Sequence, residues 1–254
     1  MITKDQLFEL SRKYKINEAT ILREYIQLYF LSRLYSYKES KNIFFKGGTA
    51  IHFIYHSSRF SEDLDFTVEE EEGKFKLFIT DFFEKLKKEE PVDFKERKTI
   101  AGKRFLLTYA PSLVNYKVFI NLDFFFREKI FLKEKSIINT DFPVIFRSYL
   151  NHPDKDELLA EKIRAFLKRK EGRDVYDIWY LLNQKAVLNE KIILEKLKYY
   201  KIYSFNKEEI LKRLEDFDKK DFILDLRPFV MNNERDRLGD FFDYVKDYIV
   251  KFLK

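Results

Sequence analysis

The segment between residues 42 and 66 restricts the possible folds more than any other part of the sequence. A short β-prone run, Asn42 to Lys46, leads into two glycines, and a helical pattern resumes over Ala50 to His56. A second β-prone run, RFSEDLDFTV, follows at residues 59–68. Strand, tight turn, helix and strand in this order predict a sheet with helices packed against it.

The remaining patterns divide the chain into two parts. Helices are expected at residues 3–37, with a break between Ser11 and Asn17, and at 74–88. The other expected elements are strands near 92–98, 103–109 and 116–126, and helices near 154–170, 173–184, 189–199, 206–217 and 234–253. We therefore predict an α+β fold. Residues 1–148 would form a mixed β-sheet flanked by helices, and residues 149–254 a helical C-terminal half.

Composition excludes several classes of protein. The chain has 254 residues, 45% of them hydrophobic, which is enough for a sizeable core. No uninterrupted apolar run approaches the roughly 18 residues that a membrane span needs, and the charged start is untypical of a signal peptide. Without cysteine, neither a disulfide framework nor a thiolate metal site is possible. We expect a cytoplasmic protein with no membrane contact, whose net charge of +6 permits nucleotide or nucleic-acid binding.

Two carboxylates two residues apart raise the question of how their repulsion is relieved. In a strand, Asp63 and Asp65 share a face, and so do Arg59 and Ser61 before them. A divalent cation such as Mg²⁺ or Mn²⁺ would relieve the repulsion, and the cation and hydroxyl suit a bound triphosphate. A lone Asp-x-Asp is also typical of an ordinary polar strand face. The structural alternative for Arg59 is a salt bridge to Asp63.

The turn before this strand suits phosphate binding. Gly47 and Gly48 let backbone N–H groups approach a phosphate, and the following helix presents its positive end to the same anion. Thr49 adds a hydroxyl donor. Two glycines alone more often only make a turn. A phosphate-binding turn followed by an aspartate pair on the next strand is a more specific combination.

A third carboxylate lies in the apolar run KVFINLDFFF. Asp123 shares a strand face with Asn121 and would be costly to bury without a partner. A role as metal ligand and base would resolve that cost, because metal-dependent nucleotidyl transfer uses a further carboxylate to activate the attacking oxygen. A structural hydrogen-bond network would resolve it equally.

The helical half carries a second polar set. Lys162 lies within an apolar stripe, where it would either extend to the surface or neutralise phosphate charge. Asp174 and Asp177 are three residues apart on the next helix, and Arg173 precedes them. Helix capping by Asp174 and an ion pair with Lys162 or Arg164 form the structural alternative for this set.

Taken together, these motifs resemble the AbiEii/AbiGii-type nucleotidyltransferases, toxins of toxin–antitoxin and phage-abortive systems within the DNA polymerase β-like nucleotidyltransferase superfamily. KGGTAIHFIY and RFSEDLDF match the Gly-Gly/Ser turn, short helix and Arg-x-Ser-x-Asp-x-Asp of that family. Over about residues 40–185, the positions carried over are Gly47, Gly48, Thr49, Arg59, Ser61, Asp63, Asp65, Asp123, Glu161, Lys162, Arg173, Asp174 and Asp177.

The resemblance implies a fold, an activity and partners. The first 148 residues would be the nucleotidyltransferase domain, and the helical half would close the active site. Asp63, Asp65 and Asp123 would hold Mg²⁺ or Mn²⁺, the glycine turn, Arg59 and Ser61 would bind an NTP, and Lys162, Arg173, Asp174 and Asp177 would complete the site. The acceptor would be the 3′ end of tRNA or other RNA, and a cognate antitoxin would be a partner. Two alternatives stay open: a protein or small-molecule acceptor, and a catalytically idle binding module.

Overall fold

The computed structural model describes residues 1–253 and divides the chain into two compact units. The first comprises Met1–Ile54, Ser61–Lys129 and Lys133–His152. The second comprises Tyr55–Phe60, Ile130–Leu132 and the chain from Pro153 onward. Two short segments that precede the C-terminal half therefore belong to the helical unit.

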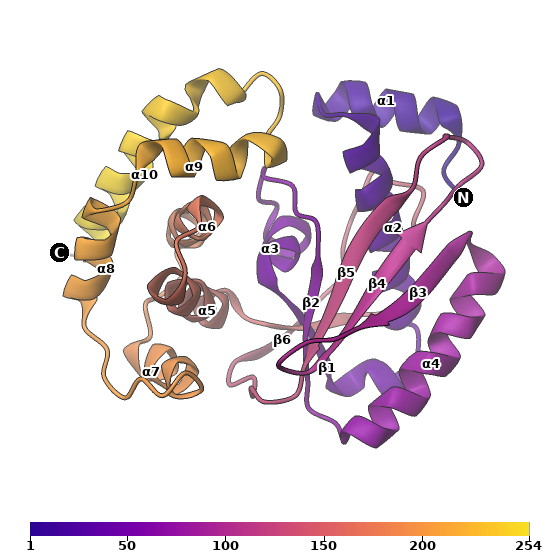
Figure 1. The fold of residues 1–254 in the computed structure, drawn as a ribbon, viewed down its shortest axis with the longest axis horizontal. Helices are drawn as coiled ribbons and strands as arrows, with labels where there is room; N and C mark the ends of the chain where they lie inside the picture. The colour runs from indigo at the N-terminus through magenta and orange to yellow at the C-terminus, as the bar shows by residue number, and fades with distance from the viewer. Residues whose placement is uncertain (254) are drawn as a thin grey trace. The chain divides into compact units, whose positions relative to one another are not determined.

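A five-stranded mixed sheet forms the centre of the first unit, in the order β1-β2-β5-β4-β3 (Figure 1). Its strands are β1 (Ile43–Lys46), β2 (Leu64–Val68), β3 (Val92–Arg97), β4 (Lys103–Tyr109) and β5 (Val118–Phe125). Only β2 and β5 run parallel, because the chain between them crosses over through a helix and two other strands. A second sheet has two strands, β6 (Lys133–Ser136) and β7 (Leu150–Pro153).

Four helices complete this unit: α1 (Lys4–Tyr14), α2 (Glu18–Leu34), α3 (Gly47–Tyr55) and α4 (Glu72–Glu89), with a 3₁₀ turn at Lys38–Asn42. Helix α2 packs on β5 and α4 on β3. The core between helices and sheet is aromatic. Phe66 and Phe124 stack with ring centroids 4.8 Å apart, and Phe30 meets Phe82 edge to face. Burial of these rings fixes the register of β2 beside β5.

The second unit is helical. Its elements are α5 (Lys155–Lys168), α6 (Gly172–Asn183), α7 (Glu190–Lys198), α8 (Lys207–Glu215), α9 (Lys219–Leu226), 3₁₀ turns at Arg227–Phe229 and Arg235–Arg237, and α10 (Leu238–Leu253). Asp154 begins α5 by accepting a hydrogen bond from the Glu157 N–H at 2.8 Å, the capping role that its position predicts. Within residues 1–253, no helix combines the length and apolar character that a membrane crossing requires.

The predicted fold class is confirmed, whereas two local predictions are wrong and one helix was missed. The strand expected at residues 59–68 begins only at Leu64, because the Phe60 N–H donates to the carbonyl of Phe229 at 2.7 Å and is lost to the sheet. Residues 149–254 are not uniformly helical, since β7 pairs with β6. Helix α9 was not predicted, and its short length explains why the periodicity missed it.

Candidate active site

Four adjacent strands of the sheet place charged side chains in one row. Lys46 on β1 is paired with Asp65 on β2, Asp65 with Asp123 on β5, and Asp123 with Arg104 on β4. Residues directly paired across neighbouring strands point to the same face of a sheet. Two of the three predicted carboxylates therefore lie side by side, with a cation in register on each flank.

Asp123 is buried, and its partner is Arg104. The guanidinium donates to both carboxylate oxygens, with Nε at 2.5 Å from Oδ1 and Nη2 at 2.8 Å from Oδ2. Asp123 is 5% exposed, while the side chain of Arg104 is 42% exposed. Such a two-pronged, charge-assisted contact is among the strongest polar interactions in proteins. It resolves the cost of burying Asp123 by the structural route that the sequence left open.

The other two carboxylates act on the same arginine. The pKa of Arg104 is raised, chiefly by its hydrogen bond to Asp123 and further by the negative charges of Asp123, Asp63 and Asp65. Asp63 lies one residue before β2, where its Oδ1 accepts hydrogen bonds from the Asn121 side-chain amide at 3.0 Å and backbone N–H at 3.3 Å. The three predicted carboxylates thus lie close together on the paired strands β2 and β5 and at the start of β2.

The glycine turn packs directly against this cluster. Gly47 has φ +78°, and a Cβ atom there would lie 2.3 Å from Oδ2 of Asp65, so both conformation and space require glycine. The Thr49 hydroxyl donates to the backbone carbonyl of Asp63. The predicted phosphate donor of Thr49 is therefore occupied by the protein, where it ties the start of α3 to the start of β2.

The carboxylates fit a divalent cation by chemistry. Carboxylate oxygens are the ligands that Mg²⁺ and Mn²⁺ prefer. In the described part of the chain, however, no three Asp, Glu, His or Cys side chains are spaced to hold a metal ion. Arg104 occupies both oxygens of Asp123. Asp63 and Asp65 are the residues that would hold the ion, and Asp123 would join them only when Arg104 releases it.

Arg59 and Ser61 are not in line with the two aspartates. Arg59 belongs to the helical unit, is buried, and donates to both oxygens of Asp177 at 2.6 and 2.5 Å. Arg59 therefore forms its ion pair with Asp177, whereas the structural alternative expected an ion pair with Asp63. Ser61 lies in the irregular chain before β2, with its backbone carbonyl accepting from the Gln27 amide at 3.2 Å. The strand on which their alignment depended does not extend to them.

Three of the polar residues predicted in the helical half, Lys162, Asp174 and Asp177, form a buried network. Lys162 Nζ lies 2.7 Å from Asp177 Oδ2 and 3.5 Å from Asp174 Oδ1, and Arg169 donates to Asp174 at 2.8 and 3.1 Å. Asp174 and Asp177 are fully buried. Burial alone would raise the pKa of Asp177, but the charges and hydrogen bonds of Arg59 and Lys162 outweigh it and hold that pKa below its ordinary value.

Two further residues suggested by the resemblance lie outside this network. Arg173 pairs with Glu171 at 3.2 Å and stacks on the ring of Phe229. Glu161 pairs with the fully buried Lys196 at 3.0 Å. Sequence reasoning missed Arg104 altogether, because only the pairing of β4 with β5 places it beside Asp123. The sequence did place Asn121 on the same strand face as Asp123. That was the available signal for the contact between Asn121 and Asp63.

Comparison with known proteins decides the family. The family described as "Nucleotidyl transferase AbiEii toxin, Type IV TA system" matches residues 29–247. The chain belongs to this AbiEii family. It is therefore a nucleotidyltransferase toxin of a type IV toxin–antitoxin system, and the resemblance noted in the sequence is confirmed. A search of curated protein sequences found no match.

Solved structures of low identity share the fold of this AbiEii protein. JHP933 from Helicobacter pylori superposes with a TM-score of 0.58 at 19% identity, covering 94% of each chain. The nucleotidyltransferase toxin MenT4 from Mycobacterium tuberculosis gives 0.59 at 14% identity, covering 98% of this chain and 90% of its own. A further nucleotidyltransferase-type structure from H. pylori gives 0.55 at 18% identity, covering 94% and 97%. These likenesses concern the fold.

Proposed function

We propose that this AbiEii protein transfers a nucleotide from an NTP to the 3′ end of an RNA, tRNA being the first acceptor to test, in the cytoplasm. The acceptor hydroxyl oxygen forms a bond to the α-phosphorus, the bond from that phosphorus to the β-phosphate oxygen breaks, and pyrophosphate leaves. The hydroxyl proton passes to a base. The observation that carries the proposal is the gathering of Asp63, Asp65 and Asp123 against the Gly47 turn.

In this proposal Asp63 and Asp65 hold Mg²⁺ or Mn²⁺. The ion, when bound, supplies positive charge that stabilises the transferring phosphoryl group. The N-terminus of α3, at Gly47 and Gly48, would present backbone N–H groups to the triphosphate. Asp123 accepts the hydroxyl proton once Arg104 has turned away, and Arg104, with its partly exposed guanidinium, then pairs with a phosphate oxygen.

The helical half contributes a positioned cation. Lys162 is the candidate for neutralising phosphate charge from this half, and Asp174 and Asp177 fix its ammonium group through the contacts described above. Arg59 acts on this lysine indirectly, since it shares Asp177 with it. A cognate antitoxin is the protein partner that the family implies.

A labelling experiment tests the proposal and separates it from its alternatives. The protein is incubated with each NTP, labelled at the α- or the γ-phosphate, together with total tRNA and cell protein. We expect label from the α-phosphate alone to enter the RNA. Label in protein or in a small molecule would identify that molecule, and not RNA, as the acceptor. An absence of transfer from every NTP would overturn the proposal in favour of an idle binding module.

Arg104 leads to a separate prediction about the metal. Arg104→Gln should raise the affinity for Mn²⁺, measured by calorimetry without nucleotide, by about tenfold, because a charge-assisted competitor for Asp123 is removed. Arg97→Gln, on the paired strand β3 and exposed, is the matched control and should leave the affinity unchanged. An unchanged affinity in Arg104→Gln would show that Arg104 does not compete with the ion.

A further inference from the structure

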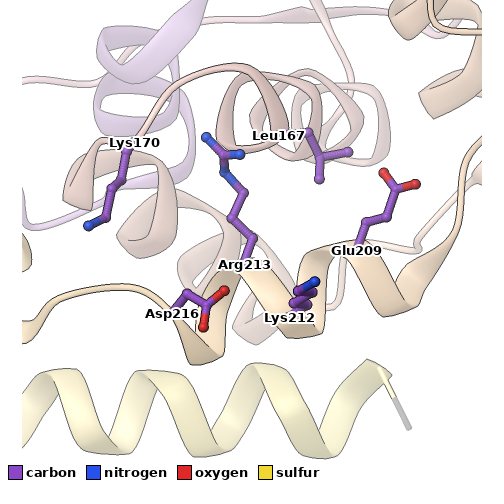
Figure 2. Close-up of a pocket in the computed structure, with 6 residues that line it drawn as sticks. All are labelled: Leu167, Lys170, Glu209, Lys212, Arg213 and Asp216. Atoms are coloured by element: carbon purple, nitrogen blue, oxygen red, sulfur yellow. The ribbon is translucent and has the colours of Figure 1, made fainter.

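A hollow of about 500 Å³ opens between the end of α5 and helix α8, within the helical unit (Figure 2). It carries three basic and two acidic side chains, and its lining is Leu167, Lys170, Glu209, Lys212, Arg213 and Asp216. Figure 2 shows Arg213 reaching from α8 toward the part of α5 that bears Leu167. None of the residues that line the hollow belongs to the carboxylate cluster, which lies in the other unit.

Arg213 has an unsatisfied hydrogen-bond donor. Its guanidinium lies over the ring of Phe166, 5.8 Å from the centroid, and its Nε is buried with no hydrogen-bond partner in the described chain. Neither Arg213 nor its neighbour Lys212 has an ion-pair partner among residues 1–253. A buried donor left unpaired is costly, and an anion that reaches Nε from the hollow would remove that cost.

An aromatic surface continues from the hollow. Arg164, Leu167 and Lys168 are three and four residues apart on α5 and so share a face. Arg164 and Lys168 lie over the ring of Tyr200, 5.2 and 5.7 Å from its centroid. Tyr200 is 46% exposed and Tyr203 72%. The connection between α7 and α8, residues 199–206, contains no acidic residue.

We propose that this surface, the hollow together with Tyr200 and Tyr203, binds single-stranded nucleic acid. A backbone phosphate enters the hollow at Arg213 and Lys212, and bases stack on the two tyrosines. Cations that follow a phosphate backbone beside exposed rings are the combination by which proteins hold single strands. An acidic peptide would pair with the cations but has no bases to stack on the two tyrosine rings. The inference deepens the proposed function, on which it rests, by placing the binding of the RNA acceptor on the helical unit.

Fluorescence anisotropy with the full chain and a labelled oligouridylate tests the proposal. Tyr203→Ala should weaken binding about tenfold, since a base loses the ring on which it stacks, while Tyr203→Phe should bind normally. Lys212→Gln should weaken binding, and the slope of log affinity against log salt concentration should become shallower by about one. Tyr149→Ala, an exposed tyrosine of the other unit, is the control.

The outcomes separate this inference from the proposed function. Oligouridylate binding is measured without NTP, so a failure of nucleotidyl transfer does not change the result expected for this surface. Normal binding by both Tyr203→Ala and Lys212→Gln would overturn the inference while leaving nucleotidyl transfer intact. Equal affinity for a fully paired duplex would also overturn it, because paired bases cannot stack on tyrosine.

Discussion

Asp63→Asn will lower the rate of nucleotidyl transfer at least about a thousandfold, because metal-borne charge stabilisation is worth several kcal/mol and each 1.4 kcal/mol is about tenfold in rate. The substitution is conservative in shape. Asp63 Oδ1 accepts from the side chain and backbone of Asn121, and the Oδ1 of an asparagine can accept the same two bonds. The charge is therefore removed while the fold is kept, and the loss appears in turnover under saturating NTP.

A matched substitution on the same sheet serves as the control for Asp63→Asn. Asp93→Asn, on β3, alters a carboxylate whose side chain is 74% exposed and pairs with Lys87 on the surface. Its activity should equal that of the unmodified protein. Melting temperatures of both variants should stay close to that of the parent. Near-normal transfer by a folded Asp63→Asn protein would remove the carboxylate cluster from the reaction.

The sequence predicted the elements that carry the cluster but not the contacts within it. Alternation and helical spacing located β1, α3 and β5 because each is an apolar pattern with clear borders. Gly47 could be predicted as a turn, whereas its need to be glycine comes from Asp65, a residue on another strand. Arg104 could not be predicted, because its place beside Asp123 depends on strand pairing, which a single sequence does not encode locally.

Arg59 illustrates a different limit. Its alternation with Ser61, Asp63 and Asp65 is compatible with a strand, and period-2 spacing alone cannot show where a strand begins. The fold places Arg59 against Asp177, so distant in sequence that no local pattern links them. The same contact explains why both charged groups can be buried, because each neutralises the other. The alternation of Arg59 with the residues that follow it does not contribute to this burial.

Asp177→Asn will reduce the free energy of unfolding of the helical unit by about 3–5 kcal/mol, because removing one member of a buried ionic network leaves its partners without compensation. Arg59 and Lys162 both lose a charged acceptor, at 2.5–2.6 Å and 2.7 Å respectively. Asp221→Asn is the matched control. Its pair with Lys170 has the same chemistry and a 3.0 Å distance but is exposed, so about 0–1 kcal/mol is expected. Urea unfolding of the full chain measures both.

The dependence of this loss on pH gives a second, independent readout. The pKa of Asp177 is lowered in the folded protein, so the folded state binds this proton less readily than the unfolded state does. The stability that the carboxylate contributes is fully present above the ordinary aspartate pKa, about 4, and is lost as the pH falls below it. The difference in unfolding free energy between the parent and Asp177→Asn should therefore be constant near neutrality and shrink in acid. A difference that grows in acid, or a loss no larger than that of Asp221→Asn, would mean that the buried network does not stabilise the unit through its charges.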